Sequence, residues 1–157
     1  MPEVKRVKCP PNARGLIEAL RDTGYDFNTA LADIIDNSID AKANKIEVTI
    51  KMDLTGNIFI SVLDDGCGMD YETLVEGMTY GSSRKKEPNR LGKFGLGLKT
   101  ASTAFCKRLS VITREAPGKE CKATWDLDEV DKASDWDLLT SSPSKEETGH
   151  IDKIAPN

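Results

Sequence analysis

Two stretches near the start of the chain carry apolar residues three and four positions apart, the spacing of one helix face. The first predicts a helix over residues 13–23, and Gly24 follows as its end. The second predicts a helix that runs to about Ala41, with Asp26 or Asn28 as its N-cap. Both helices are amphipathic, so each needs a partner surface to cover its apolar stripe.

Apolar and polar positions alternate over residues 46–52, which predicts a half-buried strand. A turn at residues 55–57 leads into a second strand over residues 58–63. Both alternating sets of that strand are fairly apolar, so we expect it to lie in the centre of a sheet. Two later strands, over residues 109–114 and 122–127, are predicted to be joined by a Pro-Gly turn.

Between these strand pairs the pattern changes to helices and a polar loop. Asp70 opens a short predicted helix over residues 71–78. Residues 79–94 are rich in Gly, Ser, Arg and Lys and poor in apolar side chains, which predicts a mobile loop. A further helix is predicted to begin near Gly95 and to run to Phe105.

The C-terminal part gives a weaker pattern. Residues 128–144 are acidic and predict no single element, whereas residues 148–154 predict a last strand. The order of elements predicts an α/β (α+β) two-layer sandwich, in which helices cover one face of a mixed, mostly antiparallel sheet. We expect residues 1–157 to form a single domain. Because the chain ends on a predicted sheet strand, we also expect it to be the N-terminal fragment of a longer protein.

Composition narrows the class of protein. The chain has 157 residues, 38% hydrophobic and 31% charged, which is typical of one globular domain with its own core. No apolar run approaches the roughly 18 residues that a membrane span needs, and the first residues lack a signal peptide's apolar core. The net charge of -4 argues against direct nucleic-acid binding by this segment. We therefore expect a cytoplasmic protein with no membrane partner.

The cysteines give no sign of a metal site. Cys9, Cys67, Cys106 and Cys121 stand apart without CxxC spacing, and only His150 could join them as a ligand. This pattern favours free thiols over a zinc site.

Residues 30–41 (ALADIIDNSIDA) place polar side chains at the edge of an apolar stripe. Asp33 and Asn37 are four residues apart, so they lie on one helical face. The amide oxygen of Asn37 could bind a Mg²⁺ ion already held by a triphosphate, since such an ion needs only one or two protein oxygens. The carboxylate of Asp33, one turn earlier, could deprotonate an attacking water. A solvated acidic helix face is the alternative for this segment alone.

Residues 63–70 (LDDGCGMD) follow a strand with an acid and a Gly-x-Gly turn. Asp64 could accept a hydrogen bond from an exocyclic amine, while Gly66 and Gly68 would let a flat base lie against bare backbone. That combination favours adenine over guanine, which carries a carbonyl at the corresponding position. An ordinary strand-to-helix turn is the alternative, because Asp and Gly are common in turns.

Residues 91–102 (LGKFGLGLKTAS) open a predicted helix with three glycines. The free N–H groups of such a helix start attract anions, and glycine lets a phosphate approach them closely. Lys93 and Lys99 could add positive point charges. The spacing fits neither the Rossmann pattern nor the P-loop.

The loop before this helix carries Ser82 and Ser83, followed by three basic residues at positions 84–86. These side chains could close over a polyphosphate as a lid. A solvated basic surface loop is the alternative.

Taken together and in this order, the three motifs resemble those of the GHKL superfamily, which includes type II topoisomerases, the ninety-kilodalton chaperones, histidine kinases and mismatch-repair MutL proteins. The resemblance covers about residues 13–114. The DNS-x-DA form and the GLK ending are most similar to the MORC-like and related bacterial ATPase branch.

The resemblance implies a sandwich that binds ATP and Mg²⁺ between its helices and a mobile lid. By position, Asn37 matches the metal-binding asparagine, Asp64 the adenine-binding aspartate and Asp33 the catalytic base. The implied nucleotide-binding residues are Asn37, Asp64, Gly66, Gly68, Met69, Ser82, Ser83, Gly92, Lys93, Phe94, Gly95, Leu96, Gly97, Lys99 and Thr100.

Two positions depart from the family pattern. Hydrolysing members usually carry a glutamate where this chain has Asp33, and the shorter aspartate places its carboxylate about an ångström or more further from the water. Many members also begin a late strand with Gly-Thr, whereas here Gly149 is followed by His150. The first departure leaves ATP binding in place but predicts slow turnover.

Three functions fit these motifs. The first is a Mg-dependent ATPase whose ATP or ADP state controls lid closure, homodimerisation and attached domains. The second is a non-hydrolysing ATP switch, because Asp33 is short. The third is the catalytic domain of a histidine kinase, which ranks last because the first motif there normally lacks these aspartates. A purely structural domain would require three ordered motif matches by coincidence.

Overall fold

The computed structural model describes residues 6–9, 12–22, 24, 26–80, 97–133 and 136–154. Helices and short antiparallel sheets make up this part of the chain, which confirms the predicted mixed α/β class. In chain order the elements are α1 (Ala13–Arg21), α2 (Phe27–Asp40), β1 (Ile46–Met52), β2 (Ile58–Asp64), α3 (Tyr71–Met78), α4 (Gly97–Phe105), β3 (Arg108–Thr113), β4 (Cys121–Asp126), α5 (Leu127–Ala133), β5 (Leu139–Ser141) and α6 (Lys145–Ile154).

Polar side chains cap the first three helices, and Asp26 and Asp70 do so as the sequence predicts. Asn12 caps α1 by accepting from the Gly15 N–H at 2.9 Å. Asp26 caps α2 and Asp70 caps α3, the latter through the Thr73 N–H at 2.7 Å. Such side chains satisfy backbone donors that the first helical turn cannot pair. The residues at which these helices begin are therefore determined by capping residues next to them in the sequence.

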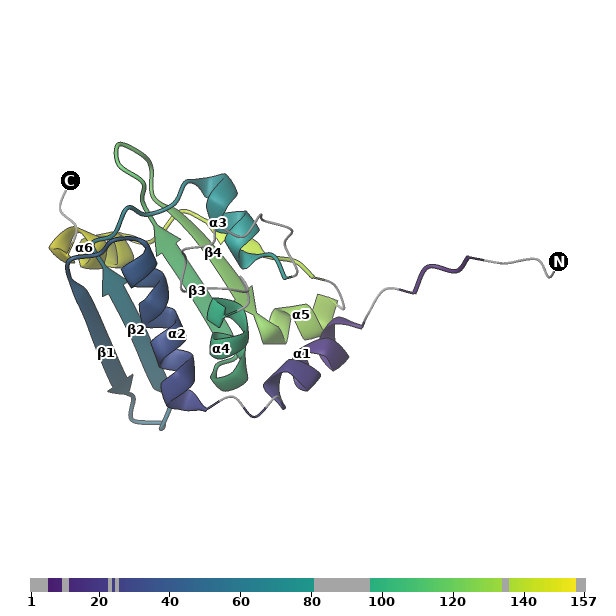
Figure 1. Cartoon of the computed structure of the whole chain (residues 1–157). Helices are drawn as coiled ribbons and strands as arrows, with labels where there is room; N and C mark the ends of the chain where they lie inside the picture. Colours follow the sequence, from purple (N-terminus) through teal and green to yellow (C-terminus); the bar gives the residue numbers. More distant parts are fainter. Residues whose placement is uncertain are drawn as a thin grey trace.

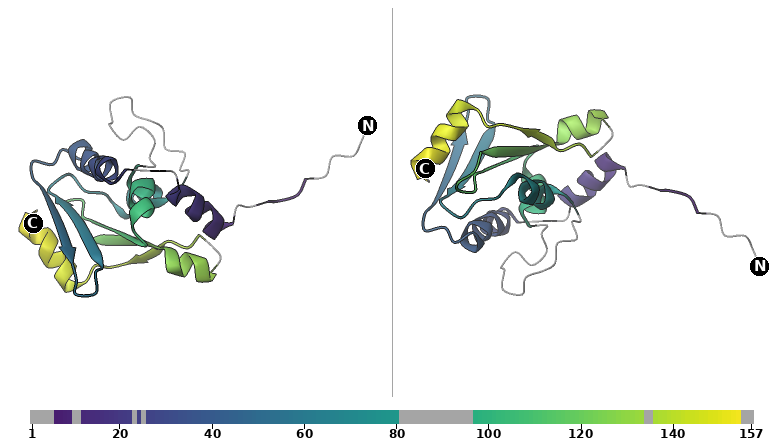
Figure 2. Two further views of the ribbon diagram at one scale, coloured as in Figure 1. Left: turned by 90° about the horizontal axis from the view of Figure 1, so that it is seen from below. Right: turned by 90° about the horizontal axis from the view of Figure 1, so that it is seen from above.

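The strands form two antiparallel sheets within the described residues. In one sheet β1 pairs with β2, and Ile46 lies opposite Asp64. In the other the order is β3-β4-β5. Figure 1 shows α2 and α4 on one side of these strands, and the two views of Figure 2 place α6 on the other side. The predicted sandwich thus has helices on both faces of its strands.

A cluster of buried hydrophobic side chains lies around β4, between α1, α3 and α5. Trp125 of β4 is at its centre and donates from Nε1 to the Met78 carbonyl at 2.8 Å. The rings of Tyr80 and Trp136 pack against Trp125. The buried members of this cluster are Ala13, Ile17, Leu74, Met78, Ala123, Trp125, Leu127 and Val130.

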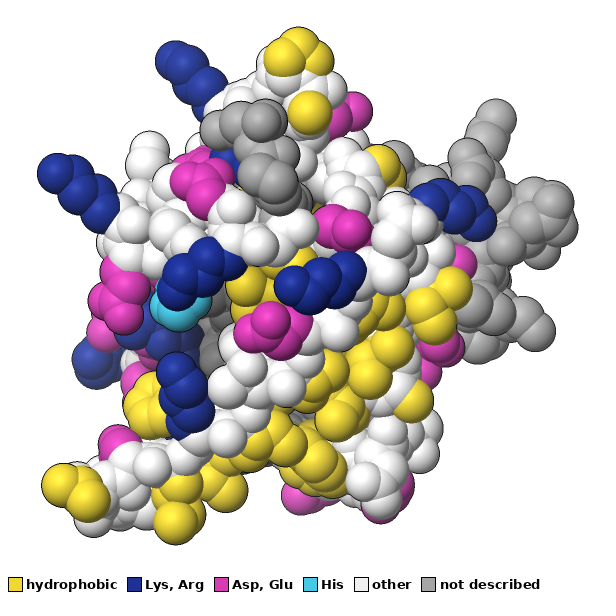
Figure 3. All heavy atoms as spheres, turned by 90° about the vertical axis from the view of Figure 1, so that its left-hand side faces the viewer, with side chains coloured by type: hydrophobic (Ala, Val, Ile, Leu, Met, Phe, Trp, Pro, Cys, Tyr) yellow, Lys and Arg dark blue, Asp and Glu magenta, His cyan; other side chains and the backbone are white. Residues whose placement is uncertain are grey.

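The prediction that β2 is a central strand differs from the structure. Within the described residues β2 pairs with β1 alone. Ile58, Phe59 and Ile60 are 41–65% exposed. Figure 3 faces this end of the molecule and shows hydrophobic side chains gathered on its surface. The apolar residues of β2 therefore do not indicate a central strand. Several of them lie on an exposed apolar surface of the described part of the chain.

The predicted strand at residues 148–154 is wrong, because this segment is helical in α6. Ser144 and Glu147 form a capping box: Ser144 N–H donates to Glu147 Oε2 at 2.8 Å, and Glu147 N–H donates to Ser144 Oγ at 3.2 Å. Residues 128–144, which predicted no single element, contain most of α5 and all of β5.

None of the helices in the described ranges is long and apolar enough to cross a membrane. Cys9, Cys67, Cys106 and Cys121 form no disulfide with one another.

Candidate functional site

The carboxylate of Asp64, at the end of β2, is held by two donors. Ser38 of α2 donates from Oγ to Asp64 Oδ2 at 2.8 Å, and Gly66 N–H donates to Oδ1 at 2.9 Å. Ser38 is buried, with 3% of its surface exposed. Each carboxylate oxygen retains a second lone pair, so the group can still accept from a ligand amine. The hydrogen bonds fix its orientation before any ligand arrives.

The turn after Asp64 lies directly against the end of α2. The Cys67 N–H donates to the Ala41 carbonyl at 2.9 Å. A Cβ at position 66 would lie 2.7 Å from Ala41 Cβ and 2.9 Å from its carbonyl oxygen. Gly68 has φ +66°, and a Cβ there would lie 2.0 Å from the Arg114 carbonyl oxygen. Glycine at these two positions therefore allows the close approach that the turn requires.

Asp65, which the motif analysis did not assign a role, anchors the other side of the same turn. Its Oδ1 accepts from the Asn44 and Lys45 N–H groups at 2.7 and 2.8 Å. The hydrogen bond from Lys45, more than the one from Asn44, holds the pKa of Asp65 below its ordinary value. The two adjacent aspartates thus have different partners: Asp65 binds the backbone just before β1, and Asp64 binds Ser38 of α2.

The amide of Asn37 is held by a hydrogen bond within its own helix. Its Nδ2 donates to the Asp33 carbonyl oxygen, one turn earlier, at 2.8 Å. That bond assigns the nitrogen, so Oδ1 is the amide atom available to a cation. The Asn37 side chain is exposed, and the Asp33 side chain is half-buried on the same helical face.

Helix α4 brings its first turn to this region. Phe27 begins α2 and Phe105 ends α4, and their rings pack edge to face with centroids 5.5 Å apart. The helices lie side by side and run antiparallel (Figures 1 and 2). The nine residues of α4 rise about 13 Å in total, so Gly97 lies beside the second half of α2, which carries Asn37. Thr100, a further predicted nucleotide contact, is half-buried in the same first turn.

Lys99 does not occupy the place that the glycine motif suggests. Its side chain is buried, and Nζ donates to the carbonyl oxygens of Gly77 and Thr79 at 2.6 and 2.9 Å. The predicted point charge beside a phosphate is therefore directed at the end of α3 instead. Its neighbours at positions 102 and 103 are also buried, so this face of α4 points inward.

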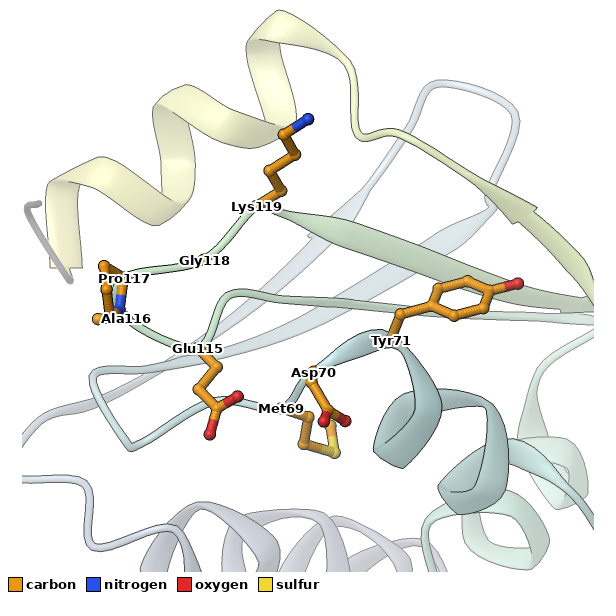
Figure 4. A pocket seen from close by; sticks show the side chains of 8 residues that line it. All are labelled: Met69, Asp70, Tyr71, Glu115, Ala116, Pro117, Gly118 and Lys119. Carbon is orange, nitrogen blue, oxygen red and sulfur yellow. The ribbon is translucent and has the colours of Figure 1, made fainter.

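Met69 lies where the Gly-x-Gly turn meets the β3–β4 hairpin. Its N–H donates to Thr113 Oγ1 at 2.8 Å. Beside it is a hollow of about 300 Å³, at the lower limit of small-molecule pockets. Figure 4 shows Met69 and Glu115 pointing to one side of this hollow and Lys119 to the other. The lining residues are Met69, Asp70, Tyr71, Glu115, Ala116, Pro117, Gly118 and Lys119.

Nearly all of the predicted lid lies outside the described residues. So do seven of the predicted nucleotide contacts: Ser82, Ser83, Gly92, Lys93, Phe94, Gly95 and Leu96. His150 is exposed on α6, so the Gly149-His150 pair does not begin a late strand.

Comparison with known proteins decides the family. Residues 25–157 match the family model described as "Histidine kinase-, DNA gyrase B-, and HSP90-like ATPase". The chain belongs to this family. The matched residues include all three motifs, and with them Ser38 and Asp64.

Curated relatives of this GHKL-type domain are MORC proteins. Human "ATPase MORC2" is 33% identical over 96 residues, which is 59% of this chain and 9% of the human protein. "ATPase morc-1" of Caenorhabditis elegans is 30% identical over 87 residues, 55% of this chain and 10% of that protein. "Protein MICRORCHIDIA 7" of Arabidopsis thaliana is 32% identical over 101 residues, 60% of this chain and 14% of that protein. The matched region thus spans 9–14% of these relatives.

Proposed function

We propose that this domain binds ATP with Mg²⁺ between the second half of α2, the turn after β2 and the first turn of α4, and hydrolyses it slowly. The observation that carries the proposal is the Ser38–Asp64–Gly66 arrangement, which presents a fixed carboxylate beside two glycines. Two of the relatives are named as ATPases, which supports the choice of nucleotide.

In this proposal the base is recognised at Asp64. An adenine amine donates to the carboxylate, whereas the guanine carbonyl at the same position would face it acceptor to acceptor. Glycine at positions 66 and 68 keeps this turn packed tightly against Ala41 and Arg114, which would hold the carboxylate in place beside the ring. ATP should therefore bind more tightly than GTP.

The residues near the end of α2 suit a Mg²⁺ ion that the nucleotide delivers. Asn37 Oδ1 would supply one oxygen, and the phosphates would supply others, which is the usual way Mg²⁺ is held beside a nucleotide. The ion would neutralise phosphate charge when bound. The first turn of α4 would place backbone N–H groups against the same phosphates, including those near Gly97 and Thr100.

Asp33 is the residue that we assign to proton transfer. It stands one helical turn before Asn37, so it would face a water beside the terminal phosphate and accept a proton from it. Its carboxylate stops one methylene short of a glutamate's. A placement error near an ångström can cost about a hundredfold in rate, so turnover should be slow.

ATP would also bias the conformation of the whole protein. A ligand shifts an equilibrium only when it binds one state more tightly. We propose that the terminal phosphate favours a closed lid and pairing of two copies, which sedimentation velocity with ATP and with ADP can compare.

The test of nucleotide binding is isothermal calorimetry with ATP and GTP, each with and without Mg²⁺. We expect ATP to bind with Kd between 1 μM and 1 mM, about -8 to -4 kcal/mol. Removal of Mg²⁺ should weaken binding, and GTP should bind at least tenfold more weakly than ATP. Equal affinities for ATP and GTP would contradict the assignment of Asp64 to the adenine amine.

A non-hydrolysing ATP switch is the second candidate, and the short side chain of Asp33 favours it. Phosphate release by Asp33→Glu and Asp33→Ala separates the two functions. If reach limits an active base, Asp33→Glu should raise turnover roughly tenfold or more, while Asp33→Ala should abolish it and spare ATP binding. Turnover that is absent in the wild type and in Asp33→Glu alike would favour the switch. Asp36→Asn, on the same helix, serves as the control.

A further inference from the structure

Lys99 is a charged residue in an interior position. It is 1% exposed, and among the described residues it is the largest side chain that is fully buried. Burial lowers the pKa of Lys99 because desolvation disfavours the charged ammonium. A lysine in such a place persists when its ammonium group is paired with good acceptors.

Those acceptors lie at the end of a different helix. Nζ donates to Gly77 O at 2.6 Å and Thr79 O at 2.9 Å, and it lies 5.8 Å from the centre of the Tyr80 ring. Gly77 is in the last turn of α3, and Thr79 is its C-cap. The carbonyls at a helix C-terminus have no partner within the helix and carry partial negative charge. Lys99 therefore caps α3 from outside.

Lys99 is also the third residue of α4, which begins at Gly97. Its own carbonyl accepts from Thr103 Oγ1 at 2.7 Å, so both ends of the residue are fixed. One side chain thus ties the first turn of α4 to the last turn of α3. The position of that first turn relative to α3 depends on this bond pair.

We propose that Lys99 is a positioning residue, which sets the first turn of α4 for phosphate binding without touching the nucleotide. This role rests on the proposed ATP function. Because Nζ is buried and two of its three donors are used on α3, the lysine acts through the backbone N–H groups of its own helix. A shift of about an ångström in that turn would weaken every phosphate contact that the helix makes.

The proposal is tested with Lys99→Met, which keeps most of the volume of the side chain, though it is one atom shorter, and removes its donors. We expect ATP affinity to fall about tenfold to a hundredfold, while affinity for adenosine, which has no phosphates, stays within threefold of wild type. The dependence of ATP affinity on salt should stay unchanged, since no charge that faces the phosphates has been removed. Lys107→Met is the matched control: Lys107 is exposed just after α4 and should leave both affinities unchanged.

Other results would overturn the proposal. Equal losses for ATP and adenosine, or no loss for either, would make Lys99 a purely structural residue. A flatter salt dependence would mean that the ammonium contacts phosphate directly. If Lys99→Met does not fold, Lys99→Arg, which keeps the donors, must bind ATP more weakly than wild type and adenosine equally well, because its longer fork displaces the turn. Wild-type protein that binds no ATP would instead overturn the proposed function itself, and this role with it.

Discussion

At the residue scale, the candidate site depends on side chains that hold other side chains. Asp64 is positioned by Ser38, which lies on the buried side of α2. Ser38 follows Leu31 and Ile35 at helical spacing, so it is a polar residue on an apolar stripe. A polar residue at such a position needs a buried partner. That signal was present in the sequence, but it did not name Asp64.

Ser38→Ala should therefore weaken ATP binding without removing it. Loss of one hydrogen bond to a carboxylate is worth about 1.5–3 kcal/mol, so we expect affinity to fall by roughly tenfold to a hundredfold. The free energy of unfolding should also fall, since Ser38 is buried. Calorimetry and thermal unfolding measure the two effects. Ser61→Ala, on an exposed position of the strand that ends at Asp64, is the control and should change neither.

Gly66→Ala tests the close approach between the turn and α2. The new methyl group would meet Ala41 Cβ at 2.7 Å, and such overpacking costs about 1–3 kcal/mol. Thermal unfolding should show this loss, together with weaker ATP binding. At Gly77 a Cβ would meet nothing within 4 Å. Gly77→Ala, within α3, should keep or raise stability by up to about 1 kcal/mol, and a similar loss in both variants would contradict the account.

At the scale of elements, the local pattern located most helices and strands but not their partners. The caps Asp26 and Asp70 and the alternation in β1 are local signals, and the structure confirms them. The prediction of a strand at residues 148–154 was wrong because this segment has too few apolar residues to show a helical period. The signal for its helix is the Ser144–Glu147 capping box, which lies just before it. The expected position of Lys99 beside a phosphate rested on its place after the glycines in the sequence. The inward face of its helix carries small polar residues at positions 102 and 103, so no apolar stripe marked that face as buried.

Polar contacts hold α6 against the sheets. Arg114 bonds both Glu120 and Asp152 through Nη1, and Lys122 donates to Glu147 at 2.6 Å. The Lys122 side chain, and after it the Ser144 N–H, keeps the pKa of Glu147 below its ordinary value. A lowered folded-state pKa means that this stabilisation is present above the unfolded-state value. It is lost as pH falls through the folded-state value.

Glu147→Gln should remove the pH-dependent part of this stabilisation. Near pH 7 the variant should be less stable than wild type by up to about 1 kcal/mol, because the charge that pairs with Lys122 is lost while glutamine keeps the capping-box bond. The difference should shrink below the ordinary glutamate pKa of about 4.3. Urea unfolding between pH 3 and 7 measures it. Glu146→Gln, its exposed neighbour in the first turn, should follow the wild-type curve, and a constant gap for Glu147→Gln at all pH values would be inconsistent with this cause.

At the scale of the whole molecule, the site joins segments far apart in the sequence. The family resemblance, not hydrophobic periodicity, predicted that Asn37, Asp64 and the glycine helix act together. The structure brings α2, the end of β2 and the start of α4 to one region. The contacts expected from residues 81–96 lie outside the described residues. Pairing between distant elements is a tertiary property, so the exposed face of β2 and the inward turn of Lys99 could not be read from local pattern.

The central claim, that Asp64 binds the adenine of ATP, is tested most directly by calorimetric titration of Asp64→Asn with Mg-ATP. We expect its affinity to fall at least tenfold, because the amide loses the charge-assisted hydrogen bond to the base. The control is Asp36→Asn, which also removes one negative charge but at a position on α2. This variant should bind Mg-ATP like wild type. Unchanged ATP affinity in a folded Asp64→Asn protein would contradict the account.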